Sequence, residues 1–218
     1  MNFPALYLIA DPSLYKIDQN HLTDEANLFF SAVNEAIAGG VSLIQYRDKS
    51  RPRREMFEIA KKLRAMTLRE KVGLIMNDEV DLALAVDADG VHLGQDDFPV
   101  EMARRLLGEE AVIGLSTHTL SEAREAEKRP VDYIGFGPIF ETGTKVSGNR
   151  PVGIEAIDAL KKQGSLPIYA IGGIQWSHLP AIVSAGATGV AVASALAGVS
   201  RAEVRAWQTC LKQAVSSP

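Results

Sequence analysis

Short apolar runs and longer amphipathic segments alternate along the whole chain. Apolar runs rich in Val, Ile and Leu, bounded by Gly or charged residues, predict buried strands. They lie at about 5–10, 41–47, 73–77, 90–93, 111–116, 131–137, 166–173 and 188–194. The segments between and after them predict helices near 24–38, 52–69, 80–86, 99–107, 120–128, 154–162, 179–185 and 201–214.

The strand–helix units follow one another without a linker rich in proline or serine. Four strand starts resemble one another: GGVSLIQ, ADGVHLGQ, DYIGFGP and ATGVAVAS. A repeated unit of roughly 25 residues is typical of a (β/α)8 TIM barrel. An open doubly wound sheet is the alternative, but no dinucleotide-binding fingerprint accompanies the repeats. We therefore expect residues 1–218 to form a single TIM-barrel domain with its active site at the carboxyl ends of the strands.

The stretch from Asn77 to Asp97 reads as the end of a strand, a helix and a second strand. Such a βαβ unit has parallel strands, so Asp78 and Asp97 should lie at the same end of the barrel. Two carboxylates there, beside Asn77 and Gln95, suit a hard cation such as Mg²⁺. The alternative is that Asp78 caps a helix and Asp97 belongs to a turn before Pro99.

Cationic and amide side chains follow the second predicted strand. Gln45, Arg47 and Lys49 occupy alternate positions, which places them on one face of an extended chain. Two cations and an amide donor pointing together suit an oligophosphate, although an ordinary charged loop has the same composition.

Glycines and a small polar pair end the last two predicted strands. Gly173 and Ala193–Ser194 suit a phosphate held by backbone N–H groups, with a helix starting near Ser194, unless the glycines only satisfy turn geometry. The long polar loop 138–152 carries Thr142, Thr144 and Lys145 and suits a lid, or a loop without function. His118, after Ser116, could carry a proton or only cap a helix, and His92 is expected to be structural.

Composition limits the partners. A net charge of −4 without a long basic cluster gives no support to a nucleic-acid partner. No apolar run reaches the length of a membrane span, and no secretory leader is recognisable at the start. A single cysteine excludes an intrachain disulfide. These features lead us to expect a cytoplasmic enzyme of small molecules, and they leave a homo-oligomer open.

Seven motifs together closely resemble the thiamine phosphate synthase family, in their order and spacing over about 6–197: QYRDK, MNDEVDLAL, ADGVHLGQDD, GLSTH, TGTK, AIGGI and GVAVAS. The resemblance implies a Mg²⁺-dependent transferase of thiamine biosynthesis. Its substrates would be the pyrophosphate of 4-amino-5-hydroxymethyl-2-methylpyrimidine and a thiazole ethyl phosphate, and its products thiamine phosphate and pyrophosphate.

The resemblance also implies roles for individual residues. Asp78 and Asp97 match the magnesium ligands. The pyrimidine pyrophosphate would be held by Gln45, Arg47, Lys49, Asn77, Ser116 and Lys145, of which Arg47, Lys49, Ser116 and Lys145 would be catalytic. The thiazole phosphate would be held by Thr142, Thr144, Gly173, Ala193 and Ser194. Many relatives have proline or threonine in place of Glu141 and Thr142, so Thr142 is the least secure of these assignments.

The resemblance implies a reaction that passes through ionisation of the pyrimidine C–O bond, a step that does not need a strong general base. Two alternatives remain open from the sequence. One is the related thiazole tautomerase, which uses a histidine matching His118 and does not need the acidic pair. The other is a non-catalytic phosphate-binding barrel.

Overall fold

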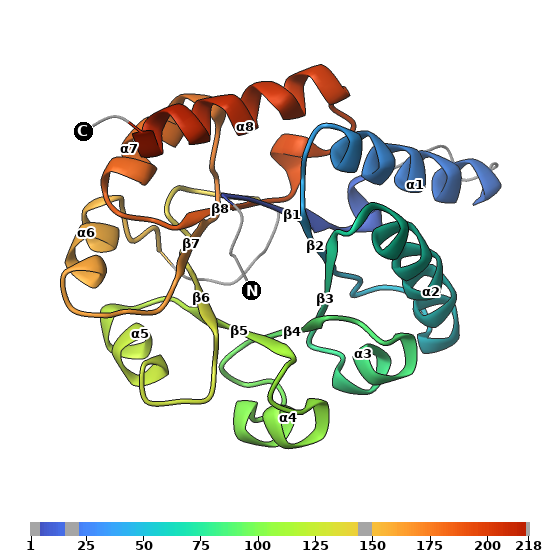
Figure 1. Cartoon of the computed structure of the whole chain (residues 1–218), viewed down its shortest axis with the longest axis horizontal. Coiled ribbons are helices and arrows are strands. Elements are labelled where there is room, and N and C mark those ends of the chain that lie inside the picture. Colours follow the sequence, from blue (N-terminus) through green and yellow to red (C-terminus); the bar gives the residue numbers. More distant parts are fainter. Residues whose placement is uncertain (1–4, 16–21, 144–149, 217–218) are drawn as a thin grey trace.

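Eight parallel strands form a closed barrel, and eight α-helices surround it in the part of the chain that the structure describes (Figure 1). This computed structural model describes residues 5–15, 22–143 and 150–216. The strands are β1 Leu6–Ala10, β2 Leu43–Tyr46, β3 Gly73–Asn77, β4 Gly90–Leu93, β5 Val112–Thr117, β6 Tyr133–Phe136, β7 Ile168–Ile171 and β8 Gly189–Val192. The helices are α1 Leu22–Ala38, α2 Arg53–Glu70, α3 Val80–Val86, α4 Val100–Leu107, α5 Leu120–Ala126, α6 Glu155–Lys161, α7 Leu179–Ser184 and α8 Arg201–Ser216.

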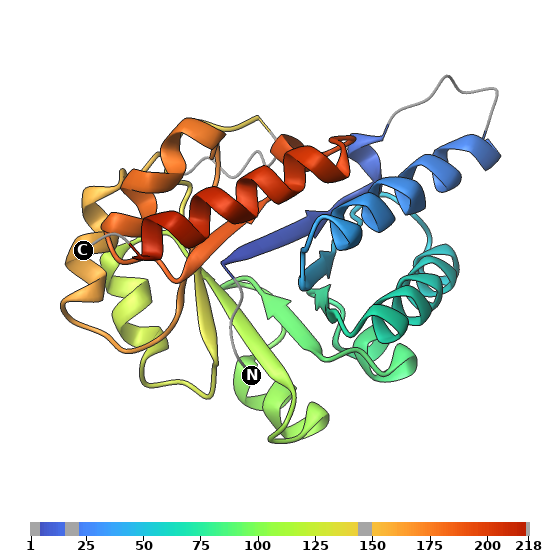
Figure 2. The same ribbon diagram turned by 45° about the horizontal axis from the view of Figure 1, so that its top comes forward.

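The strands pair in sequence order, and β1 pairs with β8 to close the barrel. Figure 2 shows α8 on the outside of this barrel, and α8 packs on both α1 and α7, which completes the ring of helices. The predicted TIM barrel is confirmed. In the described part of the chain, every helix is too short or too polar to cross a membrane.

Alternate residues of each strand belong to two separate cores, which explains why the strands are apolar throughout. Residues pointing inward, such as Tyr7, Leu43 and Tyr169, fill the barrel. Their neighbours pointing outward, such as Leu8 and Ile44, pack beneath the helices. The inner layer contains three tyrosines, Tyr7, Tyr133 and Tyr169, so its floor is aromatic and carries phenol groups.

Five predicted strands, those of β1, β2, β6, β7 and β8, are shorter in the structure. β2 ends at Tyr46 instead of Arg47, and β7 ends at Ile171 instead of Gly173. Gly172 and Gly173 have φ angles of 94° and 66°, which are incompatible with an extended strand. The polar residues that follow these strands therefore lie in loops at the carboxyl end of the barrel.

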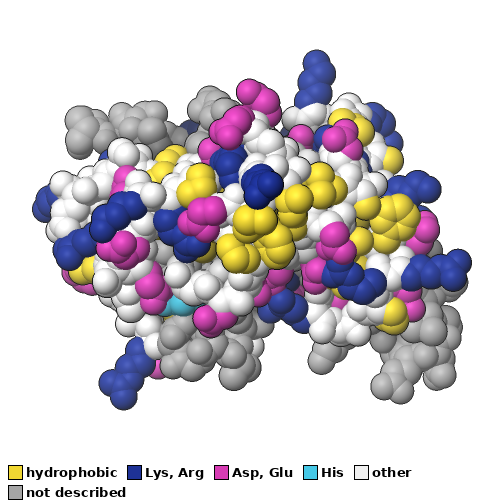
Figure 3. All heavy atoms as spheres, turned by 90° about the horizontal axis from the view of Figure 1, so that it is seen from below, with side chains coloured by type: hydrophobic (Ala, Val, Ile, Leu, Met, Phe, Trp, Pro, Cys, Tyr) yellow, Lys and Arg dark blue, Asp and Glu magenta, His cyan; other side chains and the backbone are white. Residues whose placement is uncertain are grey.

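The outer surface mixes charged and apolar side chains. Figure 3 shows hydrophobic side chains gathered near the centre of the face seen from below, among charges of both signs. Exposed apolar residues of the α4 region include Phe98, Met102 and Leu106. None of these three residues lines the carboxyl-end pocket described next.

Candidate active site

A cavity of about 440 Å³ opens among the carboxyl ends of the strands. Its walls come from both halves of the barrel, as the TIM-barrel rule predicts. Eight of the residues proposed from the sequence line it: Gln45, Arg47, Asn77, Ser116, Thr142, Gly173, Ala193 and Ser194. The structure thus brings groups expected to bind a pyrophosphate and groups expected to bind a phosphate into one pocket.

Asp78 and Asp97 face each other beside Asn77, which lines this pocket, although neither aspartate is itself a lining residue. Burial, and then the neighbouring Asp78 carboxylate, raise the pKa of Asp97. Asp78 accepts hydrogen bonds from the ammonium of Lys49 and from Asn77 Nδ2, the latter at 2.6 Å. Asp97 accepts one from the Gly94 N–H at 2.7 Å. The N-cap residue of α3 is Glu79, so Asp78 is not the simple helix cap that the alternative interpretation expected.

The two carboxylates fit a magnesium ion that is shared with a phosphorylated ligand. Mg²⁺ is commonly held by one or two carboxylates, and water and substrate phosphates complete its coordination. Among the described residues no group of three or more His, Cys, Asp or Glu side chains forms a cage. Burial, and then the neighbouring Asp78 carboxylate, disfavour a charged Asp97, and a bound cation would favour the charged form.

The sequence predicted that Gln45, Arg47 and Lys49 would share one face of an extended chain, and Lys49 does not follow this prediction. Gln45 and Arg47 line the cavity, but Lys49 lies on the rim, with 52% of its side chain exposed and its ammonium on Asp78. The reason is that β2 ends at Tyr46, so the two-residue alternation of a strand no longer controls Lys49. Lys49 therefore belongs to the acidic pair in this structure.

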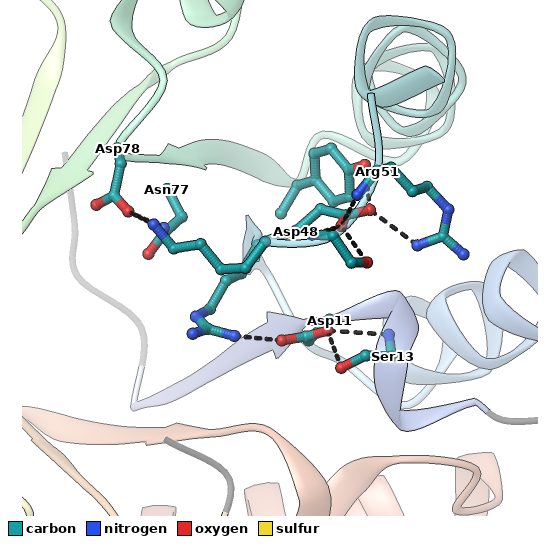
Figure 4. Close-up of polar contacts among 10 residues, drawn as sticks. Asp11, Ser13, Asp48, Arg51, Asn77 and Asp78 are labelled. Carbon is teal, nitrogen blue, oxygen red and sulfur yellow. Dashed lines mark hydrogen bonds and ion pairs between the residues drawn. The ribbon is translucent and has the colours of Figure 1, made fainter. Parts of the chain in front are cut away.

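Arg47 is held by a carboxylate that the sequence did not single out. Asp11, 4% exposed, follows β1 and accepts from Arg47 Nη1 at 2.5 Å. It also accepts from the Ser13 N–H at 2.9 Å and from Ser13 Oγ at 2.6 Å, and it caps the 3₁₀ helix η1, Pro12–Leu14. Figure 4 shows Asp11 and Ser13 on one side of this cluster and Asp78 with Asn77 on the other. The Asp-Pro pair after the first strand was the available sequence signal.

We expect Asp11→Ala to lower the free energy of unfolding by about 2–3 kcal/mol, because it removes a cap and leaves Arg47 without its buried acceptor. Urea unfolding followed by circular dichroism measures this. Asp11→Asn, which keeps an acceptor for the Ser13 N–H, should lose less. Equal stability of the alanine variant and the wild type would contradict this role.

The turns after β7 and β8 form the wall of the cavity that lies opposite Gln45, Arg47 and Asn77. A Cβ at Gly173 would lie 2.4 Å from the carbonyl oxygen of Glu141, so glycine lets this turn pack against the 140–141 segment. The α-helix expected to start near Ser194 is wrong: Ser194–Leu196 is the three-residue 3₁₀ helix η3, and α8 begins only at Arg201. So short a turn lacks the dipole of a full helix, which leaves backbone N–H groups as the expected phosphate donors.

Two residues proposed from the sequence, Thr144 and Lys145, lie outside the described residues. The loop 138–152 is described only up to Gly143 and from Arg150 onward. Thr142, in the described part, is half-buried and lines the cavity.

Two histidines and three tyrosines also line the pocket. His118 Nδ1 donates to the Gly137 carbonyl at 2.7 Å, and its backbone N–H donates to Glu122 Oε2 at 2.7 Å. His92, expected to be structural, lies in the pocket floor beside Tyr7 and Tyr133. The three tyrosines, Tyr7, Tyr133 and Tyr169, were missed from the sequence, although their inward positions in apolar strands were a usable signal.

Comparisons with known proteins agree with this geometry. The family model described as thiamine monophosphate synthase matches residues 6–196. The thiamine-phosphate synthase of Chloroflexus aurantiacus is 46% identical over 88% of this chain and 84% of its own. That of Pelotomaculum thermopropionicum is 47% identical over 83% and 84%. The solved thiamine phosphate pyrophosphorylase of Pyrococcus furiosus superposes with a TM-score of 0.80 at 36% identity, covering 98% of this chain and 96% of that chain. The chain therefore belongs to the thiamine monophosphate synthase family, which confirms the predicted family and its thiamine-phosphate synthase activity, that of a transferase.

Proposed function

We propose that this barrel joins 4-amino-5-hydroxymethyl-2-methylpyrimidine pyrophosphate to a thiazole ethyl phosphate by a dissociative, Mg²⁺-assisted substitution. The observation that carries the proposal is the single cavity between Gln45, Arg47 and Asn77 on one side and Gly173 and Ser194 on the other. The acidic pair lies beside it, with Asp78 accepting from Nδ2 of the lining residue Asn77 at 2.6 Å. Such a site can hold two phosphorylated substrates with their reacting carbon and nitrogen together.

The reaction needs one bond to break and one to form. The C–O bond between the pyrimidine methylene and the pyrophosphate breaks, and the electron pair leaves with the pyrophosphate. The thiazole nitrogen then supplies an electron pair to the resulting carbocation. No proton has to be moved, so the site needs charge neutralisation and exclusion of water more than a general base.

The cations of this chain are assigned to the leaving pyrophosphate. Arg47, fixed by Asp11, lines the cavity, and Lys49 stands on the rim against Asp78. The family resemblance adds Lys145, and Ser116 supplies a hydroxyl on the cavity wall. When bound to Asp78 and Asp97, Mg²⁺ would neutralise further negative charge on the pyrophosphate. Lys49, beside this acidic pair, is assigned to the phosphate oxygens.

The thiazole phosphate is assigned to the turns after β7 and β8. Gly173, Ala193 and Ser194 line the cavity, and so does Thr142. The family resemblance adds Thr144. A phosphate there would be separated from the acidic pair across the mouth of the barrel.

The direct test incubates the protein with both substrates, with and without Mg²⁺, and measures thiamine phosphate and pyrophosphate by mass spectrometry. We expect both products only when the metal is present. A protein that isomerises a thiazole phosphate but never joins it to the pyrimidine would instead support the tautomerase alternative, for which His118 is the candidate residue. Binding of phosphate without any turnover would support the non-catalytic barrel.

We expect Lys49→Ala and Lys145→Ala each to lose about 2–4 kcal/mol of transition-state stabilisation, because each removes a charge placed against the leaving group. Single-turnover rates at saturating thiazole phosphate measure this loss. Lys162→Ala is the matched control, since it removes an exposed Lys–Asp pair at the end of α6, with a 2.6 Å contact to Asp158, away from the pocket. Rates within threefold of wild type in both variants would remove these lysines from the chemical step.

A further inference from the structure

A continuous chain of hydrogen bonds crosses the floor of the pocket. Gln45 Nε2 donates to the Tyr7 hydroxyl at 2.9 Å, and the Tyr7 and Tyr133 hydroxyls are 2.9 Å apart. The Tyr133 hydroxyl lies 3.0 Å from His92 Nδ1, and His92 Nε2 lies 2.9 Å from Ser116 Oγ. The chain links β2, β1, β6, β4 and β5, and all five of its residues line the cavity.

The barrel interior is shaped around this chain. Tyr7, Gln45, His92 and Tyr133 are all at most 7% exposed. A Cβ at Gly114 would lie 2.1 Å from Tyr133 Cζ and 2.4 Å from His92 Nδ1, so only glycine leaves room for their contact. The rings of Tyr7 and Tyr133 also pack edge-on against each other, with centroids 6.0 Å apart, and each packs against Tyr169. The positions of the hydroxyl groups are therefore set by packing.

The chain of hydrogen bonds also has a direction, set by which group donates and which accepts at each step. The amide nitrogen of Gln45 can only donate, so the Tyr7 oxygen accepts and its single proton turns to Tyr133. Tyr133 then donates to His92 Nδ1, which leaves the proton of a neutral His92 on Nε2, where it is donated to Ser116 Oγ. Burial raises the pKa of both Tyr7 and Tyr133, so both phenols keep their protons.

The donor or acceptor role of Gln45 at one end of this chain of hydrogen bonds is consequently coupled to that of Ser116 at the other. While Gln45 donates inward, its carbonyl oxygen remains an acceptor, and Ser116, which accepts from His92, keeps its own proton to donate. If the bonds from Ser116 to Tyr133 reversed while Gln45 kept donating, Tyr7 would accept from both neighbours and its own proton would have no acceptor in this hydrogen-bond network. Leaving that buried proton unpaired is costly, so a reversal at Ser116 favours a flip of the Gln45 amide as well.

We propose that Tyr7, Tyr133 and His92 are positioning residues that hold Gln45 as an acceptor and Ser116 as a donor and thereby select an aminopyrimidine. This inference rests on the proposed function of the same site. An aminopyrimidine offers an amino N–H donor and ring-nitrogen acceptors, which complement an acceptor and a donor. The corresponding oxo-pyrimidine offers a carbonyl acceptor and a ring N–H donor instead, which is the inverse pattern.

The discrimination between these two compounds is the quantity to measure. Isothermal titration with the 4-amino and the 4-oxo pyrimidine pyrophosphates, each with Mg²⁺, gives a ratio of dissociation constants that does not depend on turnover. We expect the wild type to prefer the amino compound by at least about a hundredfold, because a mismatched pair leaves buried polar groups unpaired. Tyr7→Phe and Tyr133→Phe keep the rings but break the chain, and each should reduce this ratio about tenfold.

Tyr46→Phe is the matched control. Tyr46 is a buried tyrosine of β2 whose hydroxyl donates to Asp48 at 3.2 Å, in the outer core and away from the cavity. Its loss should destabilise the fold to a similar extent and leave the amino-to-oxo ratio unchanged. Affinity for the thiazole phosphate should also stay within about twofold in Tyr7→Phe and Tyr133→Phe, because that substrate is assigned to the opposite wall.

Three outcomes separate the two proposals. If the wild type shows no preference, or if both chain variants keep the wild-type ratio, the positioning role is overturned whether or not thiamine phosphate is formed. If the ratio falls in both variants and not in Tyr46→Phe, the positioning role is supported. If that pattern appears and no thiamine phosphate is made from the two substrates, the proposed function fails while the aminopyrimidine selectivity stands.

Discussion

Replacing Asp78 or Asp97 with asparagine is expected to lower the Mg²⁺-dependent rate of thiamine phosphate formation on the order of a thousandfold. The two carboxylates face each other closely enough for Asp78 to raise the pKa of Asp97. An amide in either position removes one negative charge and leaves a weaker ligand for a hard cation. Steady-state rates across a series of Mg²⁺ concentrations measure the effect, and the concentration that gives half activity should rise as well.

Asparagine is the informative substitution because Asp78 has a left-handed backbone, with φ of 63°. Asparagine tolerates this conformation about as well as aspartate, so the variant changes the charge without adding strain. Asp87→Asn is the matched control: Asp87 has φ of 55°, and its side chain is 98% exposed at the end of α3. Unchanged turnover and unchanged Mg²⁺ dependence in both site variants would remove the metal assignment.

Gly173→Val is expected to raise the KM for the thiazole phosphate at least about a hundredfold. Two effects act together: the φ of 66° is a strained region for a β-branched residue, and a Cβ would lie 2.4 Å from the Glu141 carbonyl oxygen. The turn after β7 must then move away from the cavity wall. Ser194→Ala, in contrast, removes a single hydroxyl and should cost about 1–2 kcal/mol of binding free energy.

Titration with the thiazole phosphate, and separately with the pyrimidine pyrophosphate plus Mg²⁺, tests both changes. Gly108→Val controls for backbone strain, since Gly108 has φ of 86° at the end of α4 and a Cβ added there would meet no atom within 4 Å. The Mg²⁺ requirement should not change in any of these variants. Loss of pyrimidine binding with thiazole binding intact would mean that the two substrates are assigned to the wrong walls.

The barrel itself was predictable from local pattern. The strands β3 and β4 and the helix α3 between them have the predicted bounds, because each is a short apolar run ended by Gly, Asn or Asp. Eight such units leave few ways to cover both faces of a parallel sheet, and closure is the simplest. The rule that TIM-barrel sites lie at strand ends then indicated the pocket residues Gln45, Asn77 and Ser116 from the sequence alone.

The limits of prediction appear where a strand stops. Lys49 was expected in the cavity because of its spacing from Gln45, but β2 ends at Tyr46 and Lys49 turns to Asp78. The expected helix at Ser194 is a single 3₁₀ turn. The position at which a strand or helix ends depends on how loops pack in three dimensions, which a periodic pattern does not contain.

What the sequence determined by itself is the alternation of buried and polar positions, and with it the fold, the family and the end of the barrel that carries the site. The tertiary structure alone decided which side chains meet there. Asp11 reaches Arg47 across 36 positions, and Tyr7 reaches Tyr133 across 126. Hydrogen bonds need donor and acceptor within about 3 Å and aligned. That geometry exists only after the barrel closes and its inner side chains pack, so no local pattern along the chain encodes it.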